Sequence, residues 1–154
     1  MRSAVFALVV LGALGCSTAP RSSAVVLSVS ASTTELQPGQ LDTLVVTTSN
    51  VTDQSVTLNF PSSCQVRPDI RQVGGSIVLP SGGTWGCREA LTQLQLAPHG
   101  SVRDVFVWSG SDAFASGMPL RSLPAGDYEV FADLQAQELA TVAVPVRIRL
   151  RAAP

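Results

Sequence analysis

From residue 24 onward, apolar and polar residues alternate along most of the chain, as they do in residues 25–30 and 56–60. Successive side chains of a β-strand point to opposite faces of its sheet, so a period of two predicts strands buried on one face. Seven strands are predicted at residues 25–30, 41–48, 56–60, 93–96, 102–108, 128–134 and 142–151, and weaker strand candidates lie at 65–70 and 76–79. Glycine and proline turns separate them, and no helical period exceeds two turns, which predicts an all-β sandwich of about seven or eight strands.

Two of these segments have features that predict their place in a sheet. Residues 102–108 are apolar on both faces, which predicts a central strand. The last segment has five apolar residues on one predicted face, namely Val142, Val144, Val146, Ile148 and Leu150. Its other face carries Arg147, Arg149 and Arg151, as the solvent face of a half-buried strand would. Pro145 cannot donate a ladder hydrogen bond, so it predicts an edge position or a bulge near the start of this strand.

The composition fits one small β-domain and excludes one class of partner. Charged residues are only 14% of the 154 residues, and 12 glycines and 10 prolines interrupt the pattern throughout. This profile is typical of short strands joined by turns, and the length fits a single domain. The formal net charge is −1 and the chain has no lysine. Since nucleic-acid binding needs clustered positive charge, the sequence gives no support for it.

The N-terminus has the organisation of a secretory signal peptide, which we assign to residues 1–15. A basic start precedes an apolar run over residues 4–14, and this run is too short to span a bilayer. The sequence Ala13-Leu14-Gly15 before Cys16 resembles a bacterial lipobox, with the leucine one place later than usual. The same residues satisfy the small-x-small rule of ordinary signal peptidase, so both routes cut before Cys16 and differ only in whether a lipid is attached.

We therefore expect an exported protein anchored to a membrane through a lipid on Cys16. Residues 16–23 form a small, polar tether without periodicity, and the domain occupies residues 24–154. In a cell with two membranes, the serine that follows the cysteine favours the outer membrane.

Lipidation of Cys16 leaves Cys64 and Cys87 as an even pair. In an oxidising compartment such a pair predicts a structural disulfide, worth about 3 kcal/mol in the chain-entropy model. The alternative is two unpaired cysteines. Metal binding has no support, because neither a C-x-x-C spacing nor a second histidine accompanies them.

Tyr128 follows a turn that contains proline and glycine, in the segment Leu123-Pro124-Ala125-Gly126-Asp127-Tyr128. This arrangement resembles the tyrosine corner of Greek-key sandwiches, in which the hydroxyl bonds to backbone a few residues upstream. The alternative is a simple core tyrosine.

An ordered set of motifs from Leu41 to Leu150 resembles the intracellular proteinase inhibitor (BsuPI-like) family of bacterial immunoglobulin-like domains. The motifs are Asn50 with Thr52-Asp53 before Val56-x-Leu58-x-Phe60, then Leu94-x-Leu96-x-Pro98-x-Gly100-x-Val102 leading to Trp108, then Leu123-Pro124-x-Gly126-x-Tyr128-x-Val130. The resemblance implies an immunoglobulin-like Greek-key β-sandwich. The export leader and the cysteine pair depart from an intracellular inhibitor, so the fold is carried over and an inhibitory loop is not.

The sequence offers few residues for catalysis. His99 is the only histidine, and its Pro-His-Gly turn predicts an exposed loop residue. An H-E-x-x-H helix and a G-x-S-x-G turn are both missing from the sequence, and the carboxylates Asp104, Asp112, Asp127 and Asp133 form no calcium-loop motif. We expect no enzymatic activity, no cofactor and no metal site.

Binding is expected at two loops of the sandwich. Residues 109–120 carry Phe114 and Met118 amid small residues, and residues 81–88 carry Trp85 next to the predicted disulfide. Exposed aromatic side chains there would anchor a partner, and the alternative is that Phe114 and Trp85 fold back to cap the core. We expect a membrane-tethered, extracytoplasmic domain that binds another envelope or secreted protein. Two alternatives stay open: a protease inhibitor of the envelope, and a structural or assembly module that pairs through an edge strand.

Overall fold

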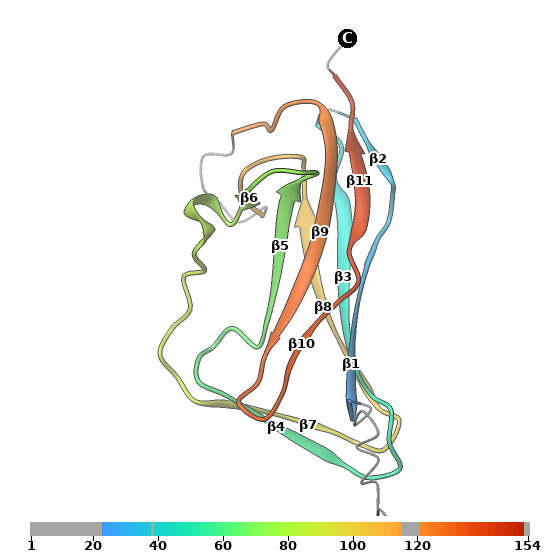
Figure 1. Ribbon diagram of the computed structural model, residues 1–154, viewed down its shortest axis with the longest axis vertical. Coiled ribbons are helices and arrows are strands. Elements are labelled where there is room, and N and C mark those ends of the chain that lie inside the picture. The colour runs from blue at the N-terminus through green and yellow to red at the C-terminus, as the bar shows by residue number, and fades with distance from the viewer. Residues whose placement is uncertain (1–22, 38, 115–120, 153–154) are drawn as a thin grey trace, which may run out of the picture.

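The computed structural model describes residues 23–37, 39–114 and 121–152, and these residues form a β-sandwich (Figure 1). Its strands are β1 (Val25–Ala31), β2 (Glu35–Leu36), β3 (Asp42–Asn50), β4 (Val56–Phe60), β5 (Val66–Gln72), β6 (Ile77–Leu79), β7 (Thr92–Leu96), β8 (Ser101–Trp108), β9 (Gly126–Gln135), β10 (Ala140–Val142) and β11 (Val146–Leu150). One 3-10 turn, η1 (Ser81–Gly83), follows β6. The predicted all-β class is confirmed. The leader, Cys16, most of the tether and Met118 lie outside the described residues.

Two sheets enclose the core. One has the strand order β1-β3-β8, and the other has the order β2-β11-β9-β5-β6, with β10 also paired to β9. β2 pairs with β11 in parallel, whereas the other described ladders are antiparallel. The architecture is a β-sandwich, as predicted, but it has eleven described strands where about seven or eight were expected.

A buried carboxylate marks the point where the chain passes from one sheet to the other. Asp42 is fully buried at the start of β3, and its Oδ1 accepts hydrogen bonds from the backbone nitrogens of Ser32 and Thr33, at 2.9 and 3.2 Å. The hydroxyl of Ser32 donates to the same oxygen. These bonds satisfy backbone donors that leave the β1 ladder, so they hold the crossover from β1 to β2.

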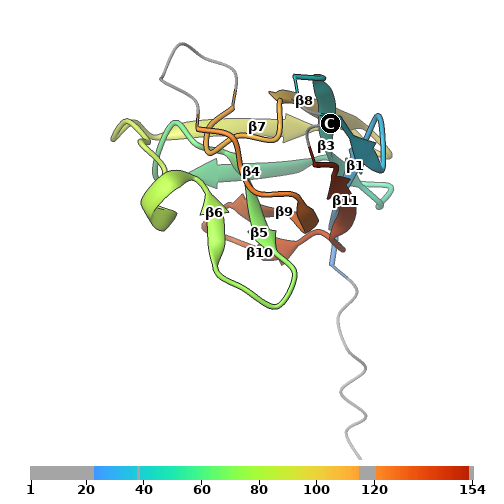
Figure 2. The same cartoon turned by 90° about the horizontal axis from the view of Figure 1, so that it is seen from above.

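β4 and β7 form a two-stranded ladder that runs across one end of the sandwich (Figures 1 and 2). Asn50 holds the corner where β3 ends. Its buried Nδ2 donates to the carbonyls of Gln54 and Ala97, at 2.7 and 2.9 Å, and its Oδ1 accepts from the backbone nitrogen of Thr52 at 3.0 Å. The residues around Asn50 and those around Pro98, which are distant in sequence, thus belong to one corner of the molecule.

The core lies between the sheets and contains the residues that the alternation predicted in β1, β4 and β9. Trp108, Tyr128 and Phe60 are the largest fully buried side chains. The rings of Trp108 and Tyr128 meet edge to face, with centroids 6.1 Å apart. The hydroxyl of Tyr128 donates to the carbonyl of Pro124 at 2.8 Å, so the predicted tyrosine corner is confirmed.

The prediction that residues 102–108 form a central strand is wrong. Among the described strands, β8 pairs only with β3 and lies at an edge of its sheet. Its outward-facing Val105 is 60% exposed. Apolar residues on both faces of a strand predict that both faces are covered. In β8, however, one row of valines lies on an open sheet face.

The predicted last strand, residues 142–151, is divided into β10 and β11. The predicted facing of its first residues was wrong. Val142 pairs with Asp133 and Val146 with Val130, so three residues of one strand lie opposite two of the other. The extra residue is a bulge at Pro145, which confirms one of the two positions predicted for it. Because a bulge reverses the alternation, Val144 is 82% exposed while Ala143 is buried.

Candidate functional site

The two predicted binding loops meet in space. The rings of Trp85 and Phe114 are stacked, with centroids 5.8 Å apart and an interplanar angle of 23°. Phe106 of β8 continues the cluster, at 5.4 Å from the Phe114 ring. All three side chains are partly buried and pack against the core. They therefore cap the core in part, as the alternative reading predicted, while keeping some exposed surface.

A disulfide and several hydrogen bonds position the loop that carries Trp85. Cys64 and Cys87 are bonded, which confirms the predicted pair. Beside it, the backbone nitrogen of Ser63 donates to the carbonyl of Arg88 at 3.0 Å, and the Arg88 nitrogen donates to the Ser63 hydroxyl at 3.0 Å. The irregular segment after β6 is thereby fixed to the chain just before β5.

Asp69 of β5 orients the indole of Trp85. The Nε1 of Trp85 donates to Oδ1 of Asp69 at 3.0 Å. This bond satisfies the one polar atom of the indole, so the ring can lie against apolar neighbours without an unpaired donor. This pairing could not be predicted from the sequence, because residues 65–70 are only weakly patterned.

A short hairpin positions the segment that carries Phe114. The nitrogen of Leu123 donates to the carbonyl of Gly110 at 2.9 Å, and the nitrogen of Asp112 donates to the carbonyl of Arg121 at 3.0 Å. In return, Oδ1 of Asp112 accepts from the nitrogen of Arg121 at 2.8 Å. The buried indole of Trp108 donates to the carbonyl of Ser111 at 2.8 Å and ties the hairpin to the core.

A groove of about 330 Å³ lies between the two loops. Residues that line it include Pro80, Thr84, Trp85, Gly86, Asp112 and Phe114. Its volume falls within the range of small-ligand and side-chain sites, about 300–1,000 Å³. Asp112 is the charged residue among the described residues that line it. It lies within the predicted binding loop 109–120, but the sequence did not single it out for binding.

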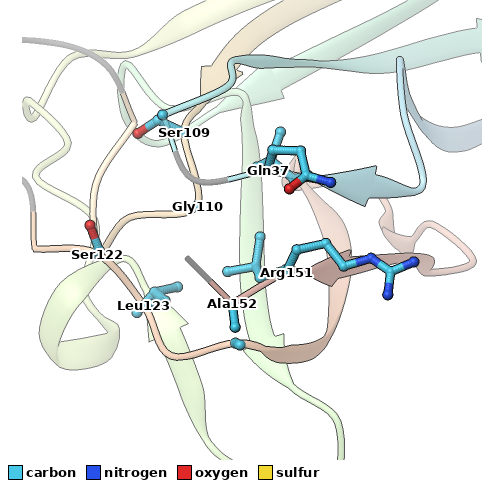
Figure 3. A pocket seen from close by; sticks show the side chains of 11 residues that line it. Gln37, Ser109, Gly110, Ser122, Leu123, Arg151 and Ala152 are labelled. Carbon is cyan, nitrogen blue, oxygen red and sulfur yellow. The ribbon is translucent and has the colours of Figure 1, made fainter. Parts of the chain in front are cut away.

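A second pocket, of about 210 Å³, lies at the end of the sandwich where β11 finishes (Figure 3). Figure 3 shows Ser109 and Ser122 on one side of it and Gln37 and Arg151 on the other. Gly110 has a φ of 74°, and a side chain there would come within 3.2 Å of Leu150. The pocket is smaller than most ligand sites, and Arg151 is paired with Glu35 at 2.6 Å.

The outer face of the larger sheet carries a ladder of ion pairs. Arg147 pairs with Glu129 at 3.0 Å and Arg149 with Asp127 at 2.7 Å. The hydrogen bond from Arg149 lowers the pKa of Asp127, and that of Arg149 is raised by the same bond. The predicted solvent-facing arginine row is confirmed. Because each of these arginines has a carboxylate partner, the row offers no free positive patch.

The outer face of the smaller sheet differs in composition from that of the larger sheet. Its residues on β1 and β3 are mainly serine, threonine and valine, and its charged residue on β8 is Arg103.

The residues considered for chemistry are dispersed. The ring Nε2 of His99 lies 2.7 Å from Oδ1 of Asp53, with both side chains exposed, as predicted for a turn histidine. Burial raises the pKa of Asp104, and burial together with nearby Asp69 raises that of Asp133. Within the described residues, no three histidine, cysteine or acidic side chains are placed to hold a metal ion.

No helix in the described part of the chain has the length and apolar character needed to cross a bilayer.

Comparisons with known proteins bear on the fold alone. No protein-family model and no curated protein matches the sequence. Among solved structures, Spo0M, a sporulation control protein from Bacillus subtilis, is similar over 86% of this chain and 51% of its own, with a TM-score of 0.51 and 10% identity.

A β-glucosidase from Erythrobacter marinus is similar over 82% of this chain and 15% of its own, with a TM-score of 0.47 and 13% identity. The alkylpurine DNA glycosylase AlkC from Pseudomonas fluorescens is similar over 84% and 31%, with a TM-score of 0.48 and 14% identity. This chain thus spans a small part of the enzymes and about half of Spo0M.

Proposed function

We propose that this chain is an exported, membrane-tethered binding domain without catalytic activity, and that it binds another envelope or secreted protein at the groove lined by Trp85 and Phe114. The observation that carries the proposal is the stacking of these two rings, 5.8 Å apart, from loops separated in sequence. Aromatic side chains that are rigidly held and partly exposed are the residues that most often dominate binding energy.

The position of the groove supports the proposal. Its loops lie beside β6, in the half of the molecule away from the N-terminal end of β1 (Figure 1). A domain tethered through residues 16–23 would hold that N-terminal end near the membrane. The groove would then face away from the membrane, where a partner can reach it.

The structural alternative, pairing through an edge strand, has less support at β8. Asp104 pairs with Val46, which is fully buried, so the carboxylate points toward the core side of the sheet. An inward-pointing charge on an edge strand disfavours the addition of another strand, because it would be buried further. The aromatic groove is therefore the better candidate contact.

Site-specific photo-crosslinking tests the proposal. A photoreactive benzoylphenylalanine at exposed Thr84, beside Trp85, should give a discrete adduct with one envelope or secreted protein in intact cells. The same group at Val144, which is also exposed but lies between β10 and β11, should not give that adduct. Trp85→Ala in the Thr84 background should reduce the adduct about tenfold or more, the usual cost of losing an aromatic anchor.

Equal adducts from both positions would show nonspecific proximity and would contradict the proposal. The absence of any adduct from Thr84, with normal export of the protein, would contradict it as well. A circular dichroism spectrum of the Trp85→Ala protein serves as the control for folding.

A further inference from the structure

We propose that the groove recognises a partner segment that carries an arginine or lysine next to an apolar residue, with Asp112 as the residue that selects the positive charge. This inference rests on the proposed binding function and adds the chemistry of the bound segment. It follows from the charge of the groove and the nature of its walls.

Asp112 is well placed to receive a cation. Its side chain is 21% exposed, and it is the one charged side chain among the described residues that line the groove. Oδ1 is held by the backbone nitrogen of Arg121 at 2.8 Å, which fixes the carboxylate. Oδ2 has one described ionic contact, to Nε of Arg121 at 3.9 Å.

The contact with Arg121 is loose enough to be replaced. The Arg121 side chain is 90% exposed, and an ion pair at 3.9 Å to so exposed a guanidinium contributes little. A cation from a partner, brought into the groove, would compete with Arg121 for Oδ2. The side chain of Arg121 is therefore a competitor, while its backbone is part of the hairpin.

The walls of the groove favour the same ligand. Trp85 and Phe114 provide aromatic surface, to which guanidinium and ammonium groups are attracted when they lie within about 6 Å of the ring. Pro80 adds apolar surface for a neighbouring aliphatic side chain. An acidic segment would meet the carboxylate of Asp112 and, behind Trp85, that of Asp69.

The occupant that we propose is a different protein. The chain has no lysine, and Arg147, Arg149 and Arg151 are each bound to a carboxylate on the outer face of the sheet. Arg88 and Arg103 are exposed, so capture of a second copy through one of them is a separate outcome of the test.

The test uses the purified full chain and two peptide probes, acetyl-Leu-Arg-Leu-amide and acetyl-Leu-Gln-Leu-amide, titrated while backbone amide chemical shifts are measured. The arginine peptide should bind with a dissociation constant on the order of 1 mM and shift the amides of Trp85 and Asp112. The glutamine peptide should bind at least about threefold more weakly, the order expected for losing one exposed charge contact.

Two substitutions should act in opposite directions. Asp112→Asn keeps an oxygen that can accept from the nitrogen of Arg121, so the hairpin is preserved, and it should weaken binding of the arginine peptide about three- to fivefold. Arg121→Gln removes the competitor and should strengthen binding about twofold. Neither substitution should change the affinity for the glutamine peptide.

The inference is overturned if the two peptides bind with equal affinity, or if Asp112→Asn does not change the affinity for the arginine peptide. It is also overturned if neither peptide shifts the amide signals at a peptide concentration of about 10 mM, which is 10-fold above the expected dissociation constant. The photo-crosslinking from Thr84 separates this failure from that of the proposed function. An adduct that persists unchanged in Asp112→Asn would leave the binding function intact and reject only the charge preference. A second copy of the chain in the adduct would reject the choice of partner.

Discussion

At the scale of single residues, buried polar groups fix the corners between strands. Asn50 uses both ends of its amide, so one side chain satisfies carbonyls on two segments that meet at the end of the sandwich. Asp42 has the same role at the crossover between the sheets. Neither residue was predicted to be buried, because polarity alone predicts exposure when the bonding partners are distant in sequence.

Asn50→Asp is expected to destabilise the fold by about 3 kcal/mol. The substitution replaces the Nδ2 donor by an oxygen, which faces the carbonyls of Gln54 and Ala97 and cannot bond to them. Urea denaturation of the purified protein measures the change. Gln95→Glu is the matched control, since it adds the same charge to the neighbouring ladder at an exposed position and should change stability by less than about 0.5 kcal/mol.

Asp104→Asn is expected to stabilise the protein at neutral pH. Burial raises the pKa of Asp104 above its usual 3.8, so the folded state binds the proton more tightly than the unfolded state does. The stability due to this group is complete below pH 3.8 and is lost as the pH rises through the folded pKa.

Denaturation of the wild-type and Asp104→Asn proteins between pH 3 and pH 7 measures the effect. The advantage of the variant should grow with pH and then level off. Glu89→Gln, an exposed loop substitution, should show no such trend. A constant difference between wild type and Asp104→Asn at all pH values would contradict the assignment.

At the scale of elements, the sequence predicted most of the strands that bury one face and missed the two-residue β2. β1 and β4 follow the alternation directly, because each packs one face on the core. The errors arise where a neighbour changes the pattern. The bulge at Pro145 adds one residue and reverses the facing of β10, and β8 has valines on an open face. A period of two contains no information on the identity of the neighbouring strand.

The candidate site was predicted in its parts and missed as a whole. Trp85 and Phe114 were chosen because they are aromatic residues in loops, and the disulfide was predicted from the number of cysteines. Their meeting depends on the sandwich bringing the segment after β6 beside the hairpin that follows β8. Asp69 and Asp112 join the site through contacts made only in the folded chain.

Loss of the disulfide is expected to cost about 3 kcal/mol and to disturb the groove. The bond links Cys64 with Cys87, 23 positions apart, and its removal restores the freedom of that loop in the unfolded chain. The double substitution Cys64→Ser with Cys87→Ser should lower the denaturation midpoint, and the arginine peptide should bind more weakly because Trp85 is less well fixed. Reductant should destabilise the wild type and leave the double variant unchanged; equal effects on both would contradict the argument.

At the scale of the whole molecule, the start of β1 and the groove lie toward opposite ends. β1 begins at the end where β4 and β7 cross, and the groove lies in the other half, beside β6 (Figure 1). This polarity has a functional meaning only if the chain is attached through its N-terminus. The eight residues from Cys16 to Ser23 would reach about 15 Å as a flexible chain, so a lipid on Cys16 would hold the first end close to the membrane.

Cys16→Ser should therefore release the protein from the membrane without preventing its export. Both cleavage routes leave residue 16 at the new N-terminus, but only a cysteine accepts the lipid, so the variant should move from the membrane fraction to the soluble extracytoplasmic fraction. Intact mass measurement of the wild type should show cleavage before residue 16, the added acyl mass and the loss of two hydrogens in the disulfide. The serine variant, cut at the same bond, should show only the disulfide. A wild-type mass equal to that of the cleaved, unmodified chain would reject the anchor, and the groove would then have no fixed direction relative to the membrane, even if its chemistry is as proposed.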